Sequence, residues 1–203
     1  GTGQQFLTTV TAGYALAKKN VMLKKLIMIY FTITMYFGGG LIPSFLLINR
    51  MGLMNTPWAI LLPGACSVWN IIIMRTQFVS IPDGLKEVAM IDGASDFTIL
   101  FRILIPLSGS VIAVLILFSA VGYWNMWYEP MIYLTERSKY PIQSVLREIL
   151  IDSNSQMMAG AGNAQTKFNV QNDAAAQTLV KYANIIVCTV PILLIYPFLQ
   201  KYF

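Results

Sequence analysis

Two runs of side chains in this sequence have the residue types and spacing that could carry chemistry. The first is an acidic run with small residues, from Glu87 to Asp96, and the second is an aromatic and amide run, from Tyr123 to Glu129. Carboxylates on a short helix can pair with basic groups of a protein partner, or can simply be solvated charges. Aromatic faces beside amides suit a sugar, whose hydroxyls need polar partners. The same aromatic run is also typical of the belt at a membrane surface.

Other chemistries are excluded by composition. The chain has no histidine, which removes Ser-His-Asp and Cys-His catalysis and every His-ligated metal site. Its two cysteines, Cys66 and Cys188, lie in apolar runs and have no C-x-x-C spacing, so they are expected to pack as small apolar residues. No G-x-x-x-x-G-K-[ST] motif is present, so no P-loop binds nucleotide here. We therefore expect no catalytic residue, metal or cofactor in this chain.

The composition predicts an integral membrane protein. Of 203 residues, 56% are hydrophobic and 11% are charged, whereas soluble domains are about 25% charged. More than half of the chain lies in runs without Asp, Glu, Lys or Arg, and a bilayer needs roughly 20 mainly apolar residues per helix. The net charge of +5 is then explained by basic residues on the cytoplasmic side, and not by nucleic acid. The uncharged runs are 1–17, 26–49, 51–74, 103–128 and 182–200.

Charges between the runs predict the topology. The connection after residue 17 carries Lys18, Lys19, Lys24 and Lys25, whereas the short connection after residue 49 carries Arg50 alone. Basic residues in short loops mark the cytoplasmic side. We therefore expect spans over Leu26–Asn49, Trp58–Met74, Ile103–Tyr128 and Tyr182–Gln200, with a cytoplasmic C-terminus. Gly38-Gly39-Gly40 and Pro43 interrupt the first of these spans, either as a kink or close helix contact or as a bend that lines a translocation path. Residues 75–107 then form a cytoplasmic loop and residues 129–180 an extracellular region.

The cytoplasmic loop is predicted to be a helix, a turn and a second helix. Ser80, Pro82 and Asp83 are typical of a helix start. Gly93 can take the positive φ that ends a helix, and Ser95 or Asp96 can cap the next one. Because the acidic residues of this segment have little positive charge beside them, they favour a protein partner over an anionic lipid surface.

The residues Glu87-Val88-Ala89-Met90-Ile91-Asp92-Gly93-Ala94, followed by Ile103-Leu104-Ile105-Pro106, resemble the EAA loop of ABC importer permeases. Val88 and Ile105 depart mildly from the family pattern. Gly38–Pro43 and Tyr123–Asn125 resemble the carbohydrate branch of these permeases, similar to the smaller permease of maltose-type importers and to oligosaccharide permeases of Gram-positive bacteria. The resemblance covers essentially all of residues 1–203. The chain is similar to a family member that lacks its first span and part of the second.

The resemblance implies an all-α fold, a polytopic membrane helical bundle of the type I importer permeases, with about five of the usual six spans and a cytoplasmic coupling helix. It implies a bacterial plasma-membrane subunit that is no enzyme itself. Its partners would be a homologous second permease, two ATPase subunits that use ATP and Mg, and an extracellular solute-binding protein that delivers carbohydrate. In this family the loop helix docks on the ATPase. The residues expected to couple are Glu87, Val88, Ala89, Asp92, Gly93 and Ala94; those expected along the substrate path are Tyr123, Trp124, Asn125, Trp127 and Tyr128.

Within that assignment, Glu87 would pair with a basic group of the ATPase, Ala89 would permit close approach, and Gly93 would permit the turn. Two alternatives stay open. One is a permease of the same family for a non-sugar solute. The other is an ion-coupled secondary transporter, a class that normally needs ionisable groups within the membrane, and the uncharged runs contain none.

Overall fold

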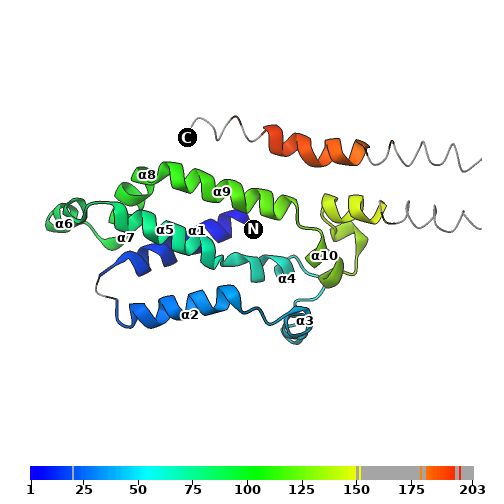
Figure 1. Cartoon of the computed structure of the whole chain (residues 1–203), viewed down its shortest axis with the longest axis horizontal. Helices are drawn as coiled ribbons and strands as arrows, with labels where there is room; N and C mark the ends of the chain where they lie inside the picture. Colours follow the sequence, from blue (N-terminus) through cyan, green and yellow to red (C-terminus); the bar gives the residue numbers. More distant parts are fainter. Residues whose placement is uncertain (20, 150, 152–178, 180–181, 195–196, 198–203) are drawn as a thin grey trace, which may run out of the picture.

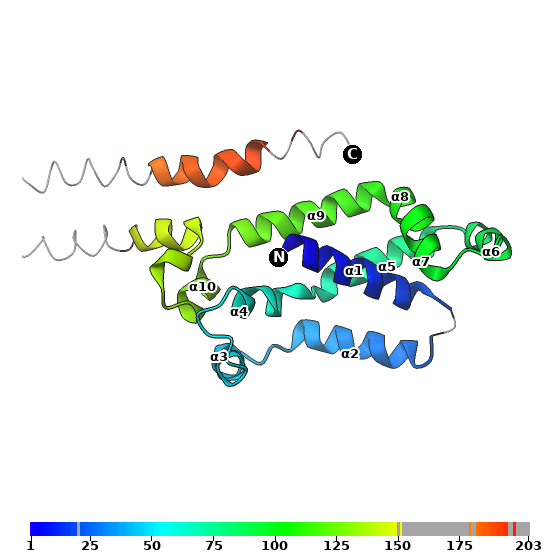
Figure 2. The same cartoon turned by 180° about the vertical axis from the view of Figure 1, so that it is seen from behind.

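The computed structural model describes residues 1–19, 21–149, 151, 179, 182–194 and 197, and every regular element in this part is a helix (Figure 1). This confirms the all-α expectation. Three helices form the centre: α1 (Thr2–Ala17), α5 (Val68–Ser80) and α9 (Gly109–Trp124). α1 packs along α5 and also contacts α9. Figure 2 shows the same arrangement from behind, with α1 against both neighbours.

The core lies between these helices and the loop segment that follows α5. Val10 of α1, Met74 and Phe78 of α5 and Leu115 of α9 are all buried there. Ile81, Ala89, Ile99, Leu100 and Leu104 continue the same cluster beyond the end of α5. The loop after α5 is therefore packed onto the bundle through its own apolar residues.

The expected interruption of the span Leu26–Asn49 is confirmed, and it divides this span into two helices. Helix α2 runs over Lys24–Tyr36, helix α3 runs over Leu41–Arg50, and the two are bent by 111°. The interruption falls at the glycines, as the sequence indicated, and Gly40 has a φ of +81° that only glycine adopts readily. The chain thus turns sharply near one end of the bundle, and α3 lies across it (Figure 1).

The expected span Ile103–Tyr128 is also broken. The segment Asp96–Leu107 and helix α9 are bent by 87° around Ser108. Residues Leu100–Leu104 are a π-helix, and Pro106 follows in the short helix α8 (Ile105–Leu107). Proline lacks the N–H that would continue the helical hydrogen bonds, and π-turns are a common site of kinks. The chain therefore bends two residues after Pro106.

Residues 58–80 likewise form more than one helix. Helix α4 covers only Trp58–Leu61, a 3-10 turn covers Pro63–Ala65, and α5 continues to Ser80 instead of ending at Met74. The Ser67 hydroxyl caps α5 by accepting a hydrogen bond from the Asn70 N–H at 3.4 Å. Arg75 therefore lies within a helix, where its Nε donates to the Leu16 carbonyl at 3.3 Å.

Within the described residues, no single helix is both long and apolar enough to cross a bilayer. Two bent pairs satisfy that test together, namely α2 with α3, and Asp96–Leu107 with α9. The last expected span is described over Tyr182–Leu194, and its remaining positions, apart from residue 197, lie outside the described residues, as do residues 152–178 of the expected extracellular region. The other elements are α6 (Asp83–Ile91), α7 (Asp96–Ile99), α10 (Tyr128–Tyr133), a 3-10 turn at Arg137–Lys139 and a helical stretch at 142–149.

Different helices and connections lie at the two ends of the bundle. α6 and α7 lie at one end, together with the lysine-rich connection between α1 and α2, while α3 and α10 lie at the other (Figures 1 and 2). At this second end the Asn55 amide donates to the Glu136 carboxylate at 2.6 Å, and the Asn55 backbone N–H donates to the Tyr133 carbonyl at 2.8 Å. The connections after α3 and after α10 are therefore joined, as expected if both lie on one side of a membrane.

Candidate functional site

Helix α6 ends in a Schellman motif. The Ala94 N–H donates to the Ala89 carbonyl at 2.9 Å, and the Gly93 N–H donates to the Met90 carbonyl at 3.0 Å. Gly93 has a φ of +77°, which is the left-handed conformation that this motif needs. Ser95 then caps α7 by accepting from the Thr98 N–H at 3.3 Å. The predicted helix, turn and second helix are confirmed, with Ser95 as the cap of the second helix.

The predicted coupling residues lie on two faces of this segment. Ala89 is only 8% exposed and packs into the chain's own core, with Ala94 partly buried beside it. The small size of Ala89 therefore permits close approach of α6 to its own bundle. Glu87, Val88 and Asp92 are exposed, and the apolar side chains of Val88 and Ile91 are 59% and 84% exposed.

The exposed face of α6 is thus apolar with acidic residues beside it. Leu85 is also largely exposed, and Phe97 continues the apolar surface onto α7. Glu87 forms no ion pair with any residue that the structure describes. An apolar patch with an unpaired carboxylate beside it is typical of a protein interaction surface.

The first turns of α6 and α7 are tied to the end of α1. Both oxygens of the Asp96 carboxylate are used, since Tyr14 donates to Oδ1 at 2.9 Å and Lys18 to Oδ2 at 2.5 Å. The hydrogen bond from Lys18, and then that from Tyr14, hold the pKa of Asp96 below its usual value. These contacts join α7 to the last turn of α1.

A similar contact holds α6. Lys19 lies 2.7 Å from the Asp83 carboxylate, and Lys86 lies 3.3 Å from its other oxygen while also donating to the Phe78 carbonyl at 3.0 Å. Hydrogen bonds from Lys19 and then Lys86 lower the pKa of Asp83. A cavity of about 530 Å³ lies between α1, α6 and α7, and Glu87 is among its lining residues. Two adjacent lysines after α1 therefore hold the helices on either side of the Gly93 turn.

The predicted substrate-path residues do not converge on one site. The Trp124 indole N–H donates to the Cys188 carbonyl at 3.1 Å, so this side chain fastens the helix Tyr182–Leu194 to α9. Trp127 has the Arg147 guanidinium 4.7 Å from its ring centroid and packs edge-on against Tyr128. Asn125 is the exposed residue after the last turn of α9.

Tyr123 alone among them lines a cavity between the helices, and this cavity is open on one side. This cavity, of about 290 Å³, lies between α1, α5 and α9. Gln5, Ser67, Asn70 and Ser119 also line it, and the sequence reasoning did not single them out. Polar residues within otherwise apolar helices were the signal that could have found them. Its lining residues are Gln5, Gly64, Ser67, Asn70, Phe118, Ser119, Gly122, Tyr123 and Met126.

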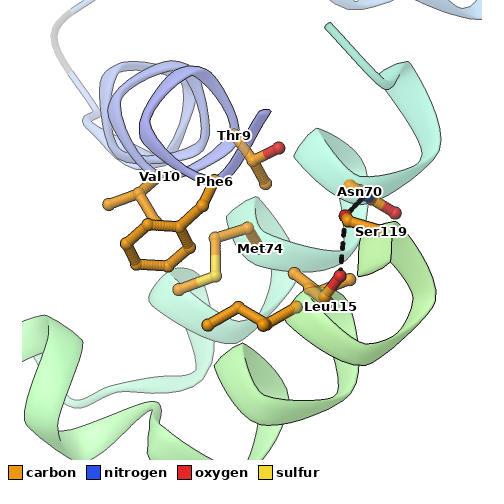
Figure 3. A pocket seen from close by; sticks show the side chains of 8 residues that line it. Phe6, Thr9, Val10, Asn70, Met74, Leu115 and Ser119 are labelled. Atoms are coloured by element: carbon orange, nitrogen blue, oxygen red, sulfur yellow. Dashed lines mark hydrogen bonds between the residues drawn. The ribbon is translucent and has the colours of Figure 1, made fainter. Parts of the chain in front are cut away.

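A second, much smaller cavity adjoins the first and shares Asn70 and Ser119 with it. Figure 3 shows this space, with Thr9 and Val10 on one side and Leu115 on the other. The Asn70 amide donates to the Ser119 hydroxyl at 3.4 Å, and that hydroxyl donates to the Leu115 carbonyl at 2.8 Å. Its volume of about 10 Å³ corresponds to roughly one water molecule. The polar side chains thus form a connected group between the two cavities.

Comparisons with known proteins agree with one another. The family described as "Binding-protein-dependent transport system inner membrane component" matches residues 9–203. The chain is 40% identical to Protein LplC of Bacillus subtilis (strain 168) over 203 residues, which are all of this chain and 66% of that protein. It is 38% identical to the polygalacturonan/rhamnogalacturonan transport system permease protein YtcP of the same organism, again over the whole chain and 69% of that protein.

A solved structure is also similar. It is described as a bacterial ABC transporter involved in the import of the acidic polysaccharide alginate. The TM-score is 0.83 at 31% sequence identity, and the similarity covers 100% of this chain and 71% of that one. This chain therefore spans roughly two thirds of the length of these three proteins.

Proposed function

Because this chain belongs to the binding-protein-dependent transport system inner membrane components, we propose that it is the permease subunit of an ATP-driven importer for a carbohydrate, and specifically for an oligosaccharide. Its family places it in the plasma membrane as a multi-pass protein and makes it a transporter subunit, with no enzyme activity of its own. The carbohydrate substrate is supported by the similarity to YtcP, a polygalacturonan/rhamnogalacturonan permease, and to the alginate importer.

The observation that most supports the proposal is the exposed face of α6. Its axis lies across one end of the bundle, its inner side is fixed by Ala89, and its outer side presents Val88 and Ile91. Glu87 is exposed beside them, at the cavity between α1, α6 and α7. Such a rigid projection can transmit motion from a docked subunit to the bundle. The docked subunit is an ATPase, and the assembly comprises two ATPases, a second permease and an external solute-binding protein.

The orientation of the chain in the membrane is inferred from the contacts at the α6 end of the bundle. The lysine-rich connection contacts Asp83 and Asp96 directly, so the connection and the α6–α7 segment lie on one side of the membrane. Basic loops favour the cytoplasm. Residues 75–107 then contain the cytoplasmic coupling loop, although α5 extends through Ser80, and residues 129–180 lie outside the cell. The C-terminus is cytoplasmic.

Right-side-out membrane vesicles that contain the complete transport system test this function. Vesicles loaded with ATP should accumulate a labelled oligosaccharide when the binding protein is added, and a protonophore should leave this uptake unchanged. An ion-coupled transporter would behave in the opposite way, since the protonophore would abolish its uptake and internal ATP would be unnecessary. That second result would contradict the proposal.

A further inference from the structure

The cavity between α1, α5 and α9 has the chemistry of a binding site. Five of its lining residues carry amide or hydroxyl groups, namely Gln5, Ser67, Asn70, Ser119 and Tyr123. The side chains of Phe118 and Met126 and the Tyr123 ring add apolar surface, and Phe118 is 57% exposed. Few convergent polar groups on an otherwise apolar wall are the usual composition of a small-molecule site.

Two polar atoms at this cavity are buried without a hydrogen-bond partner. They are Gln5 Oε1 and the Tyr123 hydroxyl oxygen. Buried polar atoms in native proteins almost always have a partner, so each of these two calls for an explanation. The Tyr123 phenol reaches its position only because residue 64 is glycine, since a Cβ there would lie 2.5 Å from the hydroxyl oxygen. A bound solute with its own hydroxyl groups could give both atoms partners after a small side-chain shift.

The lining has no carboxylate, ammonium or guanidinium group. A carboxylate of a bound solute would therefore lose part of its hydration in this open cavity without gaining a counter-charge from the lining, which is unfavourable. Donors and acceptors from amides and hydroxyls instead match a solute whose own groups are hydroxyls. The volume, about 290 Å³, is near the lower end of the roughly 300–1,000 Å³ that ligand sites occupy, so it suits one ring and not a chain.

We propose that this cavity binds an uncharged, hydroxyl-rich sugar ring of the transported solute. The proposal rests on the proposed function and adds a site and a chemical class to it. Two of the similar proteins are named for transport of polygalacturonan or rhamnogalacturonan and for import of the acidic polysaccharide alginate. We therefore expect this subunit to contact an uncharged ring of the solute, even where other rings of the same solute carry charge.

Three substitutions in the complete transport system test the site. Gln5→Leu and Tyr123→Phe remove the two unpaired oxygens, so neither breaks a hydrogen bond of the folded chain. Thr9→Val is the matched control, because Thr9 Oγ1 is also buried without a partner but lines only the smaller cavity (Figure 3). Uptake by intact cells is measured with labelled galactotriose, arabinotriose and maltotriose as neutral probes and with trigalacturonate as the acidic probe.

Loss of one neutral hydrogen bond weakens binding by about two- to tenfold. Gln5→Leu and Tyr123→Phe should therefore each raise the half-saturating concentration of the transported neutral probe by about that factor, while Thr9→Val leaves it unchanged. Unchanged uptake in both cavity variants would overturn the site. If the wild type takes up trigalacturonate but none of the three neutral probes, the assignment of an uncharged sugar ring is wrong. Failure of the wild type to take up any of the four probes would instead contradict the carbohydrate function itself.

Discussion

Replacement of Gly93 tests whether the shape of the α6–α7 segment matters for transport. Gly93 has a φ of +77°, and a Cβ added to it would have no heavy atom within 4 Å. The cost of a side chain is therefore backbone strain alone and not a steric clash. For an ordinary residue this strain is roughly 1–2 kcal/mol, and a β-branched residue is the least tolerant.

The strain can be relieved only by unwinding the turn, which breaks the hydrogen bonds from Ala94 to Ala89 and from Gly93 to Met90. A penalty of roughly 1–2 kcal/mol lowers the ratio of correctly shaped to unwound α6 by about five- to thirtyfold. Asn tolerates the left-handed conformation best among other residues, so the predicted order of function is Gly, then Asn, then Ala, then Val.

The assay is ATP-dependent uptake together with copurification of the ATPase. Gly84→Ala is the matched control, because Gly84 is exposed, lies in the first turn of the same helix, has no positive φ and also has open space around a Cβ. Gly93→Val should lose both uptake and ATPase association, while Gly84→Ala keeps both. Equal behaviour of Gly93→Val and Gly84→Ala would refute the reasoning.

Three further outcomes are expected. Glu87→Ala should abolish uptake without affecting membrane insertion. Loss of a buried charge-assisted hydrogen bond weakens an interface by about 1.5–3 kcal/mol, or roughly ten- to hundredfold in affinity. Normal uptake in this variant would exclude a contact between Glu87 and the ATPase. Trp124→Phe should lower the thermal stability of the purified protein by about 0.5–1.5 kcal/mol, since it loses the bond to the Cys188 carbonyl, whereas unchanged stability with reduced uptake would favour sugar contact instead. The contacts of Asp83 and Asp96 hold the pKa values of both carboxyl groups below their usual 3.8. The stability that these contacts add is therefore present above pH 3.8 and lost as the pH falls through the lowered pKa values. Thermal unfolding of Asp96→Asn should then vary less with pH below 4 than that of the wild type, and an identical pH profile would contradict this.

Local features of the coupling segment could be predicted from sequence because they depend on neighbouring residues alone. Gly93 ends α6 with a positive φ, Ser95 caps α7, and Pro106 lies next to the bend before α9. Each of these depends on the conformational limits of one residue type and not on distant packing. The helix content followed from the long uncharged runs.

Features that depend on tertiary contacts could not be predicted in this way. Glycines permit many backbone conformations, so Gly38–Gly40 indicated an interruption but not a bend of 111° between α2 and α3. The cavity residues Gln5, Asn70 and Ser119 come from three helices and meet only in the folded bundle. Similarly, the neighbouring residues Tyr123 and Trp124 looked like one aromatic group, but the former lines the cavity and the latter contacts the helix Tyr182–Leu194.

The most direct test of the central claim is a site-specific crosslink from α6 in intact membranes. A photoreactive residue replaces Ile91, the last residue of α6, which is 84% exposed. A control replaces Met51, which is 52% exposed and directly follows α3, the helix at the opposite end of the bundle (Figure 1). The account predicts that position 91 crosslinks to a cytoplasmic protein that contains a P-loop and is identified by mass spectrometry, and that position 51 does not. Labelling of the ATPase from position 51 and not from position 91 would contradict the account.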